Sequence, residues 1–319
     1  MSRYHQRPLD FSPLSTIPLA QRGGKVRLEH MAVPPEKSLT LAHWLDRLPK
    51  LLAADSLRAV VADLRQARAL GRGIIWGLGG HVIKCGLAPL LIDLLDRGYV
   101  TSFALNGAAS IHDFEIALAG QTSEDVEAVL PGGRFGCAEE TGCEMNLAIQ
   151  EGCDLGIGMG EALGARLERI ARPEFAPASL LLQAWRRKLP VTVHVAIGAD
   201  TPHTHPAANG AVIGAATHHD FRLFCSLLRQ LDSGGVYLNV GSAVVLPEVF
   251  LKALSAVRNL GCPLGSFTTV NFDFCDHYRP RVNVVERPHA QRGGRGYSIL
   301  GHHEILIPLL AGILADLDA

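Results

Sequence analysis

The sequence lacks a long hydrophobic run, an excess of charge of one sign and a regular spacing of cysteines. The longest apolar stretches, Leu87–Leu95 and Ile305–Ala315, fall far short of the roughly 20 residues that a membrane-spanning helix needs. The 30 basic residues nearly cancel the 31 acidic ones, so no basic excess is available for phosphate contacts. We therefore expect a protein that binds neither membranes nor nucleic acid.

The start of the chain and its cysteines indicate a compartment. Residues 1–15 lack the apolar core of a secretory signal, and the seven cysteines are odd in number. The spacing of Cys137, Cys143 and Cys153 matches no paired zinc pattern, which favours buried, apolar cysteines. A reduced, cytoplasmic protein is the expectation.

Short apolar runs that end in Gly or Asn alternate along the chain with helical stretches. Because these runs are continuously apolar, both faces of each strand are expected to be covered, as in a parallel sheet. Right-handed crossovers then place helices on both faces. The sequence predicts an α/β fold with a doubly wound, mainly parallel, Rossmann-like sheet. The expected strands are residues 73–78, 101–106, 191–197, 236–240 and 267–272. The expected helices are residues 39–48, 56–70, 87–97, 109–119, 123–130, 144–151, 161–171, 179–188, 219–231, 246–260 and 302–317.

Two segments fall outside this alternation. Residues 1–37 are rich in proline and have little apolar periodicity, which predicts an extended N-terminal arm before a single α/β domain over residues 38–319. The segment from Pro288 to Tyr297 is rich in glycine and arginine. It is expected to be either a mobile cover for the site or a disordered crossing.

Polar residues follow every expected strand, which predicts a site at one edge of the sheet. In an open parallel sheet, ligands bind beyond the carboxyl ends of the strands, because the loops diverge there and helix N-termini point inward. The alternative is that these loops are polar only because loops usually are. The residues concerned, in strand order, are Gly79, Gly80 and His81; Asn106, Gly107, His112 and Asp113; Asp200, Thr201, His203 and His205; Asn239, Gly241, Ser242 and Glu248; and Asp273, Asp276, His277, Tyr278 and Arg279.

The first of these loops is similar to a dinucleotide-binding turn. The stretch from Gly77 to Val82 has valine where the usual motif has its third glycine. Asn106 also stands where such folds carry an acidic residue that holds a ribose. An ordinary Rossmann dehydrogenase is therefore not favoured.

Histidines offer two further kinds of chemistry. His203 and His205 would project to the same side of an extended segment, and with Asp200 they would ligate a metal or hydrogen-bond a substrate. We assign no metal, because no third strong ligand can be identified. His277 with Cys275 is a weaker candidate pair, since no oxyanion motif accompanies it.

The order of these motifs resembles that of the deoxyhypusine synthase family, whose fold is a Rossmann-like NAD-binding domain. The resemblance runs from about Gly73 to Leu317 and begins with a strand and Gly-rich turn, GIIWGLGGH. The stretch VTSFALNGAASIHD is similar to the family's Thr-Thr-Ala-Gly-Gly turn with its following acids. PVTVHVAIGADT resembles a strand ending in Asp-Gly-Ser, with Asp200 at the aspartate, and VYLNVGSAVVLPEVF resembles a glycine-rich turn before a helix. FTTVNFDFCDHYRP falls where the family has an acidic loop ending in Arg-Pro.

The resemblance implies NAD as cofactor and a small, polyamine-like amine as substrate. A cationic amine would lie near Asp200, Asp273 and Asp276, because it gains charge-assisted hydrogen bonds from carboxylates. Family members are homotetramers with active sites at subunit contacts, which implies a homo-oligomer, a tetramer or a dimer. The residues implied to lie against NAD are Gly79, Gly80, Asn106, Gly107, Asp113, Gly241 and Ser242.

One departure from the family changes the expected reaction. The family's imine-forming lysine after Arg-Pro is absent here, and no lysine follows Lys252. Arginine stays protonated and cannot replace it. We expect an NAD-dependent enzyme that oxidises a small amine or transfers a fragment of it, with His203, His205 or His277 as base. The alternatives are a metal-dependent hydrolase that uses Asp200, His203 and His205, and a non-catalytic ligand-binding homologue.

Overall fold

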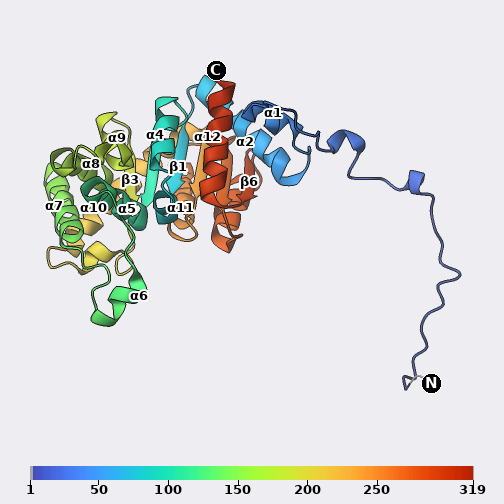
Figure 1. Cartoon of the computed structure of the whole chain (residues 1–319), viewed down its shortest axis with the longest axis horizontal. Helices are drawn as coiled ribbons and strands as arrows, with labels where there is room; N and C mark the ends of the chain where they lie inside the picture. The colour runs from blue at the N-terminus through green and yellow to red at the C-terminus, as the bar shows by residue number, and fades with distance from the viewer. Residues whose placement is uncertain (1–2, 319) are drawn as a thin grey trace.

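Within residues 3–318, which the structure describes, six strands form one parallel sheet in the spatial order β3-β2-β1-β4-β5-β6 (Figure 1). The structure is a computed structural model. β1, β4 and β5 are buried along their whole length, because helices cover both faces of the sheet. The predicted α/β fold with a doubly wound parallel sheet is therefore confirmed. The strands are β1 Ile74–Leu78, β2 Ser102–Asn106, β3 Val191–His194, β4 Val236–Val240, β5 Thr268–Asp273 and β6 Arg295–Leu300.

The helices divide between the two faces of the sheet. α10, α11 and a π-helical segment, Pro280–Glu286, cover one face, and α2, α4, α5 and α12 cover the other. The helices are α1 Leu41–Arg47, α2 Leu52–Ala69, α3 Gly80–Lys84, α4 Ala88–Asp96, α5 Gly107–Ala119, α6 Val126–Val129, α7 Glu139–Leu155, α8 Met159–Ile170, α9 Leu180–Arg186, α10 Gly210–Leu228, α11 Val245–Asn259 and α12 His303–Leu317. The short 3-10 turns are Leu19–Gln21, Leu28–His30, Leu130–Gly132, Ala176–Ala178, Thr201–Thr204, Arg229–Leu231 and Arg287–His289.

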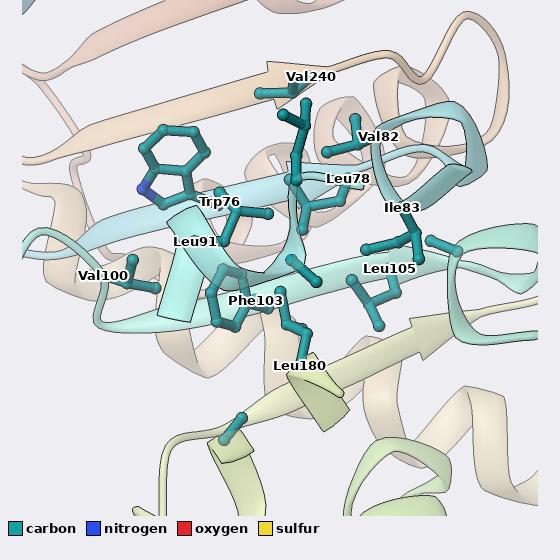
Figure 2. Close-up of a cluster of buried hydrophobic side chains, with 14 of the residues drawn as sticks. Trp76, Leu78, Val82, Ile83, Leu91, Val100, Phe103, Leu105, Leu180 and Val240 are labelled. Carbon is teal, nitrogen blue, oxygen red and sulfur yellow. The ribbon is translucent and has the colours of Figure 1, made fainter. Parts of the chain in front are cut away.

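The larger core lies on the α4 side of the sheet. Figure 2 shows Trp76, Leu78, Phe103 and Leu105 of the neighbouring strands β1 and β2 meeting Leu91 of α4. The indole Nε1 of Trp76 donates to the backbone oxygen of Tyr99 at 3.0 Å, so its one polar atom has a partner in the core. This packing holds β1 and β2 rigidly below the loops that follow them.

Two sequence predictions are wrong about local structure. Residues 295–300, partly assigned to a cover or disordered crossing, form the edge strand β6, which is more exposed than the central strands and so lacks their continuous apolarity. α10 begins at Gly210, so His218 and Asp220 lie within this helix and do not begin it. The expected five strands are all present, although β3 ends at His194 instead of residue 197.

The N-terminal arm runs away from the sheet, as Figure 1 shows. Its last part is tied to α1, because the Val33 amide donates to the Arg47 oxygen at 2.9 Å. Several of its large apolar side chains, including Leu9 and Phe11, are exposed. In the described part of the chain, no helix has the length and apolar character needed to cross a membrane.

His194, at the end of β3, makes the stability of the fold depend on pH. It is 3% exposed, and burial lowers its pKa to about 3. Below pH 6.5 the His194 side chain becomes protonated in the unfolded chain but stays neutral in the folded chain until the pH is close to 3. This residue therefore destabilises the fold as the pH falls. Between pH 7 and 5, we expect the free energy of unfolding to fall by about 2 kcal/mol more in the wild type than in His194→Gln.

Urea unfolding of both proteins at the two pH values measures this difference. Asp113 and Asp220, whose pKa values burial raises to about 6 and about 7, change stability in the opposite direction. Both are present in both proteins, so their contributions cancel in the comparison. Equal pH dependence in the two proteins would show that His194 is not the residue responsible.

Candidate functional site

The strand order reverses direction beside β1, and this reversal marks the candidate site. From β1 the chain builds outward through β2 and β3 on one side, then through β4, β5 and β6 on the other. In open α/β sheets, the loops that follow the two strands at such a reversal leave in opposite directions, and ligands bind in the crevice expected between them at the carboxyl edge.

The turns after β1 and β4 touch through their backbones. The Gly79 amide donates to the Val240 oxygen at 2.8 Å, and a Cβ added at Gly79 would lie 1.9 Å from the Gly241 oxygen. Gly241 has a φ of +66°, in the left-handed region. Only glycine fits at both positions, so these glycines are needed to close the floor of the crevice.

The neighbouring glycine has a packing role of its own. A Cβ at Gly80 would lie 2.7 Å from the Cβ of Ala108, so Gly80 lets α3 approach α5. Val82, in the place of the third motif glycine, is buried in the core.

Asp200 lies over the start of α5. A Cβ at Gly107 would lie 2.2 Å from an oxygen of the Asp200 carboxyl group, which also accepts a hydrogen bond from the Ala196 amide at 2.8 Å. Burial raises the pKa of Asp200. The Nδ1 atom of His203 is buried nearby without a hydrogen-bond partner among the described residues, and both side chains line a small cavity.

Two other predicted residues have capping roles. The Asn106 side chain accepts from the Ala109 amide at 2.9 Å and caps α5. The Ser242 hydroxyl accepts from the Leu246 amide at 3.2 Å, and its backbone oxygen accepts from the Asn239 side chain. Each lies at the predicted edge, but its contacts are those of a residue at a helix start.

A second polar group is formed by residues at or after the ends of β1, β5 and β6. Asp273 is 2% exposed, and its Oδ1 accepts from the Phe274 amide at 2.8 Å. His303 is fully buried and its Nε2 lies 3.2 Å from the Phe272 oxygen. The His81 ring lies 5.6 Å from the His303 ring and 5.7 Å from the ring of Phe274. These residues belong to three elements, α3, the end of β5 and the start of α12.

Sequence reasoning missed Cys85 and Glu304 as members of this edge. The Cys85 thiol lies 3.6 Å from a carboxylate oxygen of Glu304, a contact between residues more than two hundred positions apart. Burial, with the nearby Glu304 charge, raises the pKa of the Cys85 thiol. Cysteines were expected to be buried, whereas Cys137 and Cys275 are exposed and the others described are half-buried. No local pattern could have revealed a contact that depends on the sheet.

The remaining predicted residues lie apart from these groups. His205 lies against Gly142 of α7, and its Nε2 is 3.4 Å from a Glu139 oxygen. His277 lies half-buried in the loop after β5, and Asp276 is exposed there. The Asp276 carboxylate lies 3.7 Å from the guanidinium of Arg281.

Asp113 lies inside the molecule and contacts the start of α9. It is fully buried, and its carboxylate accepts from the Leu180 and Leu181 amides at 2.6 and 2.9 Å and from the Ser179 hydroxyl at 2.7 Å. Burial raises its pKa to about 6, although these donors lower it. Its oxygens are committed to the fold, and no contact places it toward the crevice.

The three carboxylates predicted to share an amine do not form one cluster. Asp200 lies over the loop after β2, and Asp273 ends β5. β2 and β5 are three strand positions apart, which is about 14 Å. The polar residues of the edge therefore form two groups, one around Asp200 and one around His81.

A different hollow opens at the amino edge of the sheet. It has a volume of about 560 Å³ and is lined by loops that precede β4, β5 and β6. Its charged side chains serve the loops themselves, because Asp232 accepts from the Gly265 amide and Arg292 donates to the Pro263 oxygen. We therefore keep the carboxyl edge as the candidate site.

Comparisons with known proteins connect this chain to others through its fold. No protein-family model and no curated protein matches it. A proposed deoxyhypusine synthase from Entamoeba histolytica matches with a TM-score of 0.50 and 10% identity, over 88% of this chain and 95% of that one. At this identity the match supports the α/β fold alone.

Two further structures match with lower scores. A proposed LOR/SDH protein from Methanococcus maripaludis S2 has a TM-score of 0.48 and 16% identity, over 90% of this chain and 74% of that one. AgrE, in a ternary complex with ornithine and NAD+, has a TM-score of 0.47 and 17% identity over 82% of this chain. This chain spans only 33% of the AgrE chain.

Replacing Asp113 tests whether it serves the fold. Asp113→Ala would leave two buried amides and a hydroxyl without their acceptor, so we expect the free energy of unfolding to fall by about 3 kcal/mol. Asp276→Ala, at an exposed position, is expected to change it by no more than about 0.5 kcal/mol. Urea unfolding measures both values. Unchanged stability in Asp113→Ala together with lost ligand binding would return Asp113 to the site.

Proposed function

We propose that this chain is an NAD-dependent enzyme that oxidises a small amine, with the cofactor in the crevice beyond β1 and β4. The observation that carries the proposal is the reversal of strand order at this point, with two glycine turns in backbone contact. Sheets with this order bind dinucleotides at the reversal. The order of sequence motifs, which resembles that of the NAD-binding deoxyhypusine synthase family, supports the same cofactor.

The residues at the crevice fit a nucleotide better at β1 and β4 than at β2. α11 is a long helix whose start follows Gly241 and Ser242, and a helix start favours a phosphate. The start of α5, in contrast, is covered by the Asp200 carboxylate, which would repel a phosphate there. We therefore propose that Gly79, Gly80, Gly241 and Ser242 contact the cofactor. Asn106 and Gly107 would lie at the border of its site.

The Asp200 group fits the amine. Among the described residues, His203 is the basic side chain that acts on the half-buried Asp200 carboxylate. A protonated amine would supply this carboxylate with a charge-assisted hydrogen bond. His203 is the best placed of the three predicted bases, because its unpartnered Nδ1 lies beside Asp200. It would take the proton that the amine must lose as its carbon is oxidised.

NAD, when bound, supplies the acceptor for hydride. The chain itself offers no lysine after Lys252 to hold an imine, so the proposed reaction ends with an oxidised amine instead of a fragment bound to the protein. His205, His277, Asp273 and Asp276 stay predictions, because their contacts lie outside the Asp200 group. A homo-oligomer also stays a prediction.

The metal-hydrolase alternative has less support. Among residues 3–318, the ligand atoms of Asp200, His203 and His205 do not form a group close enough to hold a metal ion. His205 turns toward α7 instead. The non-catalytic alternative is separated from the proposal by the measurements below.

The cofactor proposal predicts stabilisation by NAD+ and its loss on adding a charge to the crevice. At a hundred times its dissociation constant, NAD+ should stabilise the fold by about 2.7 kcal/mol, seen as a rise in melting temperature. Val244→Glu places a carboxylate at the exposed start of α11 and should weaken binding by repelling the phosphates. Leu260→Glu, at a more exposed position at the opposite end of α11, should bind normally. No shift at millimolar NAD+, or equal loss in both variants, would contradict the assignment.

The amine proposal predicts a specific role for the Asp200 charge. With NAD+ present, spermidine binding measured by calorimetry should weaken about tenfold or more in Asp200→Asn, because one charge-assisted hydrogen bond is lost. Glu127→Gln, which removes the charge of an exposed carboxylate on α6, is the control and should bind as the wild type does. Turnover with bound spermidine separates an enzyme from a binding homologue, since NADH absorbance rises only if hydride is removed. Equal affinity in both variants would exclude Asp200 as the amine ligand.

A further inference from the structure

Three side chains of different chemistry meet at the carboxyl edge, away from the Asp200 group. The ligand atoms of His81, Cys85 and Glu304 all lie within 4.8 Å of one another. Among the described residues, no other such group of three is found. They offer an imidazole nitrogen, a sulfur and a carboxylate oxygen.

The local structure explains why two of these side chains face the same way. The Cys85 amide donates to the His81 oxygen at 2.9 Å, the bond of one α-helical turn. Residues four apart lie on one side of a helix, one above the other. The short helix α3 therefore presents His81 and Cys85 as a pair.

The tertiary fold brings Glu304 to this pair. A Cβ at Gly241 would lie 3.0 Å from the His303 ring and 3.2 Å from the Val82 side chain, so this glycine lets α12 and α3 meet above the turn of β4. Glu304, in the first turn of α12, then lies 3.6 Å from the Cys85 sulfur. The contact depends on the same glycine turn that forms the crevice.

We propose that His81, Cys85 and Glu304 bind a divalent transition-metal cation, with zinc as the ion their chemistry fits best. Nitrogen, sulfur and oxygen together suit a cation of borderline softness, and calcium and magnesium would not use the thiol. Zinc bonds of about 2.0 to 2.3 Å require ligand atoms about 3.3 to 3.8 Å apart. His81 and Glu304 are exposed, so small side-chain rotations close the remaining gap.

The number of ligands indicates the kind of site. Three protein ligands leave the fourth position of a tetrahedral cation for water or a substrate atom, the arrangement of catalytic zinc. His302 lies beside the site, with its Nδ1 3.8 Å from a Glu304 oxygen. The cation would face the crevice at its β1 side, where it would polarise an oxygen or nitrogen atom of a bound molecule. The thiol proton leaves to solvent when the cation binds.

The metal is not needed for the fold. A chain of this length buries enough surface without a metal, and of the three side chains only Cys85 packs against the core, where it is partly buried. Removing the cation should therefore leave the far-ultraviolet circular dichroism unchanged. The proposal stands apart from the NAD-dependent function, because the cation can be measured without either NAD+ or amine.

Cobalt(II) titration of the full chain after chelator treatment tests the site. One Co²⁺ per chain should bind, with a thiolate-to-cobalt charge-transfer band in the near ultraviolet, and Zn²⁺ should abolish the band by displacement. Cys85→Ser should remove the band, whereas Cys275→Ser, an exposed cysteine after β5, should keep it. Glu304→Gln should keep the band but weaken Co²⁺ binding at least tenfold.

Two results would overturn the assignment. One is the absence of a stoichiometric charge-transfer band in the wild type, and the other is a band that survives in Cys85→Ser. A normal cobalt band with no response to NAD+ would remove the proposed function and leave the metal site in place. An NAD+ response without a cobalt band would do the reverse.

Discussion

The backbone contact between the turns after β1 and β4 is the constraint on which the carboxyl edge depends. Gly79 and Gly241 approach so closely that no side chain fits between them. The same Gly241 gives room to Val82 of α3 and His303 of α12. A larger residue here would separate the two turns and two helix starts at once, so the crevice and the His81 group share one structural cause.

The parts of the fold that sequence predicts well are those whose signal is local. β1 and β4 lie between two helical layers, so their residues are apolar on both faces and stand out in the sequence. β6 lies at the edge of the sheet and is only partly buried, so it needs no continuous apolar pattern. Its sequence lies within a segment rich in glycine and arginine, which does not indicate a strand. Similarly, the fold tolerates the buried Asp220 carboxylate in the middle of α10 because it accepts hydrogen bonds from the Gly160 and Val193 amides. These partners are distant in sequence, so the sequence does not indicate them.

The same distinction explains the candidate site. That polar residues gather at one edge follows from the ends of parallel strands, which the sequence locates. How these residues group at the edge depends on the order of the strands in the sheet, and the sequence does not reveal that order. Asp200 and Asp273 both end at this edge, yet the strands between them hold them about 14 Å apart. Asp113, close in sequence to the edge, turns inward because α9 offers three donors to its carboxylate.

The Asp200 group and the His81 group lie at different strands of the carboxyl edge and offer different ligands. The half-buried Asp200 carboxylate at the start of α5 would favour a cation and disfavour a phosphate, so the proposed amine fits the β2 side. On the β1 and β4 side, the carboxylate in the first turn of α11, Glu248, already pairs with Lys252 and Arg279, and the His81 group lies at the same edge. In these proposals, a nucleotide at the start of α11, a metal ion on the His81 group and an amine beside Asp200 would occupy separate positions, because each would be held by charge of a different sign or by ligands of a different softness.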